Sequence, residues 1–338
     1  MKIKISSAGK TLVFPVILLC VAALAARPEV YIKSSLEGLK LWALVVAPSL
    51  LPFFFLTALT SALGITEKLS AILSRPTRRL FNCGGVCSYA FLMSVLSGYP
   101  VGAKIISDLK KNGLITQSEA TRASTFCSTS GPLFIIGSVG TGMFGNKKVG
   151  YMLIICHILS AIICGLIFRN YGNKTLSSND GLLPNRSANA LYESVYSSVI
   201  SLAVVGGFIC VFYVFADMAA DAHLFFPLEY LLALLLKRTD IPSAFCSGLI
   251  ECTRGCLALS KCGLSTYSVA FAAANISFGG VSVIAQSVAF LSSAKTDVKI
   301  FVLSKIIQTA ISFCLALGSC ASSASSVSFT CLPRSISP

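Results

Sequence analysis

The sequence predicts an all-α polytopic membrane protein built as an inverted repeat, in which each half has a re-entrant helical hairpin and a broken transmembrane helix. Of 338 residues, 55% are hydrophobic and only 12% are charged, and the mean hydropathy is +0.81. Several apolar segments approach the roughly 20 residues that a spanning helix needs. Glycine and proline interrupt such segments at matching places in both halves, and broken segments of this kind mark the binding sites of transporters.

The charge pattern and the missing motifs exclude several classes of function. The net charge is +14, but the basic residues lie in short clusters between apolar segments and have no aromatic platform beside them. This pattern indicates cytoplasmic loops and argues against nucleic-acid binding. The sequence has no Walker loop, no HExxH and no GxSxG motif. We therefore expect no enzyme activity, no cofactor and no metal.

Residues 1–40 are predicted to form an N-terminal transmembrane helix and an amphipathic link. Lys2, Lys4 and Lys10 precede the apolar run 11–26, which favours a cytoplasmic N-terminus in the cell membrane. The small residues at the end of the run leave a cleaved signal peptide as the alternative.

Residues 41–168 are predicted to form the first repeat. Ser97-Gly98-Tyr99-Pro100-Val101-Gly102 interrupts an apolar segment that is too short to cross twice, which favours a re-entrant hairpin with its tip at Ser97 to Gly102. Thr116 and Glu119 have the spacing of a capping box, so a helix should begin near Gln117. In order, the repeat contains an apolar helix (41–65), a basic surface segment (66–85), the hairpin (86–113), a broken helix (117–144) and a last helix (149–168).

A cytoplasmic linker, 169–190, is rich in Ser, Asn and Gly and separates the halves. Residues 191–318 should then repeat the same order, and a Ser-rich tail, 319–338, is expected to be disordered. The predicted second repeat contains an apolar helix (191–216), a short apolar segment (224–238), the hairpin (241–263), a broken helix (264–291) and a last helix (298–317).

The two halves align at small residues and have opposite predicted orientations. Ser94 aligns with Ser247, Gly102 with Gly255, and Gly131 with Gly279. Counting crossings from a cytoplasmic N-terminus inverts the second half. The basic residues agree with this count, because most of them, including Lys110, Lys111 and Lys305, fall in segments assigned to the cytoplasmic side.

Polar residues at the interruptions are the candidate substrate-binding residues. Glu251 carries the most weight, because a carboxylate at membrane depth is costly unless it is paired or hydrated. The alternative for Glu251 is a local ion pair with Arg254, and for residues at the helix breaks it is that they only satisfy the broken backbone. The full set is Ser97, Tyr99, Thr129, Ser130, Glu251, Asn275 and Ser277.

Three stretches carry a resemblance to a known family: SGYPVGAKIISDL (97–109), STSGPLFIIGSVGTGMFG (128–145) and GLIECTRGC (248–256). They resemble the sporulation integral membrane protein YlbJ family, whose members have the nucleoside-recognition Gate domain also found in nucleoside transporters and in FeoB iron transporters. The resemblance covers about residues 40–320. It implies that repeats 1 and 2 are Gate-like and that the protein serves spore cortex formation.

A more distant resemblance is to concentrative nucleoside transporters, which also have paired hairpins and broken helices in an inverted repeat. Ala274-Asn275-Ile276-Ser277 is similar to their Ala-Asn-x-Ser break, and Glu251 to the glutamate of their second hairpin. Two features differ. Ser97-Gly98-Tyr99 stands in the region of their Gln-Thr-Glu, and Phe278 stands where they have a second serine.

Two hypotheses follow from the residues and the resemblance together. The first is a transporter that moves a small polar solute, with a nucleoside-like solute as one option, by alternating access. The second is a scaffold for cortex assembly that keeps a transporter fold without transport. The expected partners are membrane lipid and the solute, with a coupling ion and a homo-oligomeric partner as further options, and no nucleic acid.

Overall fold

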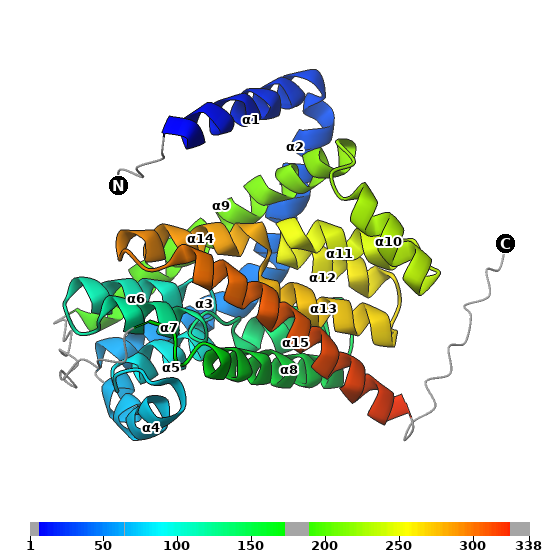
Figure 1. The fold of residues 1–338 in the computed structure, drawn as a ribbon. Coiled ribbons are helices and arrows are strands. Elements are labelled where there is room, and N and C mark those ends of the chain that lie inside the picture. Colours follow the sequence, from blue (N-terminus) through cyan, green and yellow to red (C-terminus); the bar gives the residue numbers. More distant parts are fainter. Residues whose placement is uncertain (1–6, 64, 173–188, 325–338) are drawn as a thin grey trace.

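The computed structural model describes residues 7–63, 65–172 and 189–324, and every regular element within these ranges is a helix (Figure 1). Four helical stretches in this part of the chain are long and apolar enough to span a membrane: Lys147–Ile167, Ala190–Asp221, Thr266–Ser293 and Val298–Cys320. A fifth candidate is the pair Pro28–Val46 and Leu50–Thr60, bent by 58°. The predicted all-α, multi-pass membrane fold is confirmed.

The elements that precede the linker run from α1 to α8, and α2, η1 and α3 among them form one long bent helix. Thr116 Oγ1 accepts the N–H of Glu119 at 3.2 Å, and Glu119 Oε2 accepts the N–H of Thr116 at 2.8 Å, so the predicted capping box starts α7. The elements are α1 (Ser7–Ala26), α2 (Pro28–Leu41), η1 (Trp42–Val46), α3 (Ala47–Ala62), α4 (Ile65–Phe81), α5 (Cys87–Ser97), α6 (Val101–Lys111), α7 (Gln117–Ser124), η2 (Leu133–Met143) and α8 (Lys147–Ile167).

The second half has the same order of elements. α5 and α6 correspond to α11 and α12 as the arms of a hairpin, and α7 and η2 correspond to α13 and α14 as the pieces of a broken helix. The elements are α9 (Ala190–Asp221), α10 (Phe226–Leu236), α11 (Asp240–Ile250), α12 (Cys252–Lys261), α13 (Thr266–Phe278), α14 (Gly280–Ser293) and α15 (Val298–Ala324). Each hairpin arm has 10 or 11 residues, about 16 Å at the rise of a helix, so no arm crosses a hydrocarbon core of about 30 Å.

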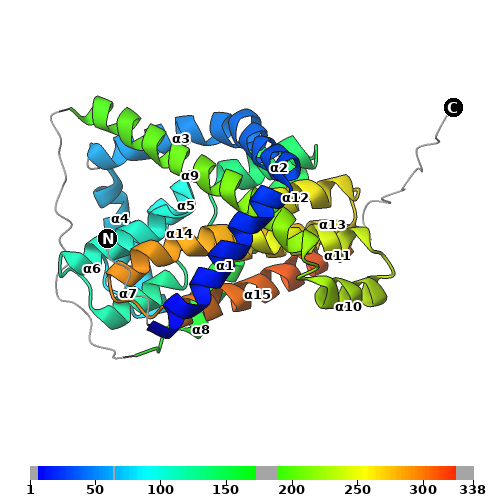
Figure 2. The same cartoon turned by 90° about the horizontal axis from the view of Figure 1, so that it is seen from above.

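The halves pack on one another reciprocally. The second arm of the first hairpin, α6, packs against α14, and the second arm of the second hairpin, α12, packs against η2. Likewise α7 contacts α15 and α13 contacts α8. Figures 1 and 2 both show α6 beside α14, on the opposite side of the molecule from α10. Elements far apart in sequence thus exchange equivalent contacts, as the halves of a repeat related by a two-fold axis do.

Glycines let each hairpin tip lie directly against the broken helix of its own half. Gly98 has a φ of +78°, and a Cβ on it would lie 2.7 Å from the backbone nitrogen of Gly131. Gly280 has a φ of +73°, and a Cβ on it would lie 2.8 Å from the carbonyl oxygen of Ile250. Only glycine fits either position, because the backbone conformation and the close approach both exclude a side chain.

Two predicted boundaries differ from the helices observed. The limit between 40 and 41 falls inside the continuous bent helix made by α2, η1 and α3, and α15 continues to Ala324, past the predicted start of the tail at 319. The residues after 318 are mostly Ala and Ser, which weaken a helix less than Gly or Pro does. Most of the predicted linker (173–188) and the rest of the tail (325–338) lie outside the described residues.

Candidate functional site

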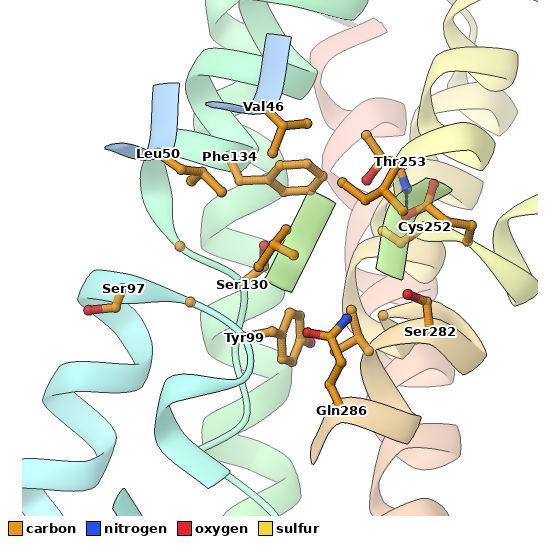
Figure 3. A pocket seen from close by; sticks show the side chains of 17 residues that line it. Val46, Leu50, Ser97, Tyr99, Ser130, Phe134, Cys252, Thr253, Ser282 and Gln286 are labelled. Carbon is orange, nitrogen blue, oxygen red and sulfur yellow. Dashed lines mark hydrogen bonds between the residues drawn. The ribbon is translucent and has the colours of Figure 1, made fainter. Parts of the chain in front are cut away.

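Both hairpin tips and both helix breaks line one cavity of about 70 Å³ (Figure 3). The first half contributes Ser97, Gly98 and Tyr99 from its tip and Ser130 and Gly131 from its break. The second half contributes its tip and the start of α14: Glu251, Cys252, Thr253, Gly279, Ser282, Val283 and Gln286. Apolar side chains complete the wall: Val46, Leu50, Phe134, Val205 and Ile209. Four of the seven predicted site residues, Ser97, Tyr99, Ser130 and Glu251, therefore meet at one cavity.

Glu251 is the N-cap of α12 and lies at the tip of the second hairpin. Its Oε1 accepts the backbone N–H of Thr253 at 3.1 Å, and its Oε2 accepts that of Arg254 at 2.6 Å. The residue is only 2% exposed. A carboxylate is favoured at this place because the first N–H groups of a helix lack partners and carry partial positive charge. The backbone therefore stabilises a buried anion at the edge of the cavity.

Arg254 does not form the ion pair with Glu251 that the sequence left open. Its guanidinium instead forms an ion pair with Asp217 of α9 and donates to the carbonyl oxygen of Tyr213 at 3.1 Å. Only the backbone N–H of Arg254 reaches the Glu251 carboxylate. The two charges thus have separate partners, and the Arg254–Asp217 pair ties the second hairpin to α9.

Tyr99 reaches from the first tip to the second helix break. Its hydroxyl donates to the carbonyl oxygens of Ile276 and Ser277 at 3.3 and 3.5 Å. It also accepts from Lys305 Nζ at 3.2 Å. Figure 3 shows the Tyr99 ring beside Gln286 of α14. The residue therefore connects the two halves at the cavity.

Lys305 is buried within α15, and its predicted place among the cytoplasmic basic residues is wrong. It lies within α15, is 1% exposed, and donates to the carbonyl oxygen of Ser128 and to Gln308 Oε1 at 2.9 Å. The signal for a buried position was available: Lys305 and Gln308 are three residues apart in an apolar stretch and so share one helix face.

Three predicted site residues lie outside the cavity lining. Thr129 Oγ1 pairs with Ser94 Oγ at 2.9 Å, and Ser277 Oγ pairs with His157 Nδ1 at 2.9 Å. Asn275 is fully buried, and its amide nitrogen and oxygen have no hydrogen-bond partner. A Cβ on Gly248 would lie 2.0 Å from Asn275 Nδ2, so the amide packs closely against the second hairpin.

His157 joins the two helix breaks. Its Nε2 accepts the backbone N–H of Ser130 at 2.9 Å, and this contact requires that the proton of a neutral ring sit on Nδ1. Nδ1 then donates to Ser277 Oγ. The sequence pattern around His157 does not show that its two partners belong to opposite halves.

Four polar residues of the cavity were not singled out from the sequence: Cys252, Thr253, Ser282 and Gln286. Ser282 and Gln286 are four residues apart on α14 and so share one face, and Figure 3 shows both in the cavity lining. Two polar residues with this spacing directly after Gly279-Gly280 could have predicted a polar helix face at the break. Cys252 and Thr253 simply follow Glu251 at the tip.

Comparison with known proteins gives the family. No family model matches the chain. Among solved structures, a variant of the concentrative nucleoside transporter CNTnw in its intermediate 1 state aligns with 92% of this chain and 88% of that chain, with 12% identity and a TM-score of 0.49. Sporulation integral membrane protein YlbJ of Bacillus subtilis (strain 168) is 32% identical over 330 residues, covering 90% of this chain and 81% of that protein. Identity of this extent shows that the protein belongs to the family of the sporulation integral membrane protein YlbJ.

Proposed function

We propose that this protein is a permease that moves a small polar solute across a membrane of the developing spore and thereby serves cortex formation. The observation that carries the proposal is the cavity shared by both hairpin tips and both helix breaks. Broken helices with hairpin tips around a polar site are the usual binding architecture of transporters built from inverted repeats. A nucleoside-like solute is one candidate.

In this proposal Ser97, Tyr99, Ser130 and Glu251 contact the solute. Thr129, Asn275 and Ser277, which lie behind the lining, would hold the broken backbone in place. The cavity of about 70 Å³ is well below the roughly 300–1,000 Å³ of typical ligand sites. Alternating access therefore requires that the halves move apart before a solute enters.

The proposed topology has a cytoplasmic N-terminus and the linker 169–190 on the same side. Asp217 and Asp221, at the end of α9, then lie at the opposite face. Support comes from the reciprocal packing of the halves and from the basic residues that remain after Lys305 is removed from the count. Labelling of single cysteines with an impermeant thiol reagent, in a cysteine-free background, tests it. Labelling of the linker and of the Asp221 end from the same side would contradict the inverted repeat.

A non-transporting scaffold is the second candidate, and one observation favours it. Five apolar side chains close one wall of a small cavity, as in a site that never opens. Purified protein in proteoliposomes, assayed with labelled nucleosides, amino acids and inorganic ions, separates the candidates. Uptake above that of empty liposomes supports the permease. No uptake of any compound, together with normal sporulation of a Glu251→Gln strain, supports the scaffold.

A further inference from the structure

The ammonium group of Lys305 is a buried charge whose acceptors are all neutral. Ion pairs in the described part of the chain include Arg27–Asp221, Arg238–Asp240 and Arg254–Asp217, and Lys305 belongs to none of these three. A buried charge needs strong polar partners to replace its lost hydration. The structure must therefore hold this cation with oxygen atoms that carry only partial charges.

Three such oxygens surround Lys305 Nζ, and each is of a different chemical kind. They are the backbone carbonyl of Ser128 in the first break, the hydroxyl of Tyr99 at the first tip, and the side-chain amide oxygen of Gln308. The ammonium also lies 4.9 Å from the centroid of the Tyr99 ring, close enough for a cation–π interaction. Neutral oxygens of this kind replace the hydration shell of monovalent cations in proteins.

The second break adds negative potential at this place. The Tyr99 hydroxyl donates onward to the carbonyl of Ile276 at 3.3 Å, in the last turn of α13, where the unpaired carbonyls of a helix carry partial negative charge. The donor chain from Lys305 through Tyr99 to Ile276 polarises each bond in the same direction. The site is thus built to favour a cation from both halves.

Two polar atoms of the same cluster have no partner. Ser128 Oγ and Gln308 Nε2 are buried and make no hydrogen bond. The serine hydroxyl belongs to the residue whose carbonyl oxygen accepts from Lys305 Nζ, and no hydrogen bond engages this hydroxyl. The cluster therefore has more oxygen than one ammonium group engages.

We propose that Lys305 is a tethered cation that occupies a monovalent-cation site between the first hairpin tip and the first helix break. It is a positioning residue: its ammonium holds Ser128 and Tyr99 together, and with the side chain shortened the vacated site takes a small free cation. The wild-type protein then needs no external ion to keep its first half assembled. This inference does not depend on transport, because it concerns ion binding and stability.

The test is chemical rescue of purified, full-length Lys305→Ala. Its Tm is measured at constant ionic strength in ammonium, methylammonium, sodium or potassium chloride, with N-methylglucamine chloride as the baseline, because that cation is too large for the site. We expect a Tm roughly 5 °C or more below that of the wild type in the baseline salt, with at least half of the loss restored by one of the small cations. Ethanol at the same concentration should restore nothing.

Lys299→Ala is the matched control, since Lys299 is an exposed lysine of the same helix. The Tm of this variant and of the wild type should not depend on the choice of cation. A Lys305→Ala protein whose Tm is equally insensitive, or is restored as well by ethanol, would overturn the proposal.

Lys305→Met decides the case if Lys305→Ala does not accumulate. Methionine keeps most of the volume but leaves the Ser128 carbonyl, Tyr99 and Gln308 without their donor. The proposal expects a lower Tm that no cation restores, because the methionine fills the site. A Tm equal to that of the wild type would overturn it.

Discussion

The two halves build the same backbone around one cavity, but their interruptions hold side chains of opposite charge, and both of these side chains come from the second half. In the first half the break presents the Ser128 carbonyl, and a cation, Lys305, binds there. In the second half the tip presents the N–H groups of Thr253 and Arg254, and an anion, Glu251, binds there. The charge at each interruption thus matches the end of the peptide group exposed there, carbonyl oxygen or amide hydrogen. Inverted halves can therefore share a fold and still hold opposite charges at their interruptions.

The close glycine contacts are the feature that both halves share, and their loss should have the largest effect. A Cβ on Gly102 would lie 1.7 Å from the carbonyl oxygen of Cys127, and one on Gly255 would lie 2.2 Å from the Cα of Gly248. We expect Gly102→Ala and Gly255→Ala to lower stability by more than about 3 kcal/mol. Size-exclusion chromatography of a fluorescent fusion should show little folded protein.

Gly207→Ala is the control for the glycine variants. Gly207 lies in α9, and a Cβ there meets no atom within 4 Å, so the substitution should leave the amount of folded protein unchanged. If only one of the two hairpin variants is destabilised, the halves are not equivalent at their glycines.

Replacing Glu251 tests the anionic side of the cavity. Glu251→Gln keeps the shape and an oxygen that can cap α12, but it removes the charge. The variant would no longer make a charge-assisted contact with the solute, which is worth about 1.5–3 kcal/mol. Uptake in proteoliposomes should therefore fall roughly ten- to hundredfold, while membrane abundance stays near that of the wild type. Glu193→Gln, at an exposed position in the first turn of α9, is the control. Normal uptake by Glu251→Gln would remove this residue from the site.

Arg254 and Asp217 carry charges that stabilise the fold, whereas Glu251 carries its charge at the cavity. Variants of the ion pair should therefore change stability. Both side chains are about a quarter exposed, so Arg254→Gln or Asp217→Asn alone should cost about 1–3 kcal/mol. The double variant should recover part of this loss, because no charge is left without its partner. Thermal unfolding of the two single variants and the double variant gives the coupling energy. Strictly additive losses would mean that the pair contributes no net interaction.

An effect of similar size is expected at His157, which joins the halves without a net charge. His157→Phe keeps a ring of similar size and removes the hydrogen bonds to Ser130 and Ser277. Each bond contributes about 0.5–1.5 kcal/mol, so the free energy of unfolding should fall by roughly 1–3 kcal/mol. Ser277→Ala removes one of these bonds and should cost less. An effect of Ser277→Ala that exceeds that of His157→Phe would show that Ser277 has another role.

The sequence predicted the architecture well because interruptions are local features. Gly98 and Pro100 ended one helix and began the next, and Gly279-Gly280 did the same in the second half, where backbone freedom and missing donors act within a few residues. Ser97 adjoins the first of these interruptions, and it lines the cavity as predicted from the sequence.

Partners distant in sequence could not be predicted in the same way. From its neighbours in sequence alone, Lys305 is predicted to be a basic residue of a cytoplasmic loop. Its burial depends on Ser128 and Tyr99, which lie in the other half. Likewise, the nearest acidic residue to Arg254 in sequence is Glu251, yet α9 brings Asp217 to its guanidinium. Such pairings depend on tertiary packing, which a single sequence does not show.

The reciprocal packing of the halves also bears on how the chain is made. Ribosomes release the N-terminal half first, so the hairpin α5–α6 and the first break leave the ribosome long before α14 and α15, their partners in the second half. Polar backbone without a partner is costly in lipid, and Ser128 has no donor until Lys305 has been synthesised. The nascent first half must therefore stay in a hydrated or protein-lined environment, such as the insertion machinery, until the last helix is complete.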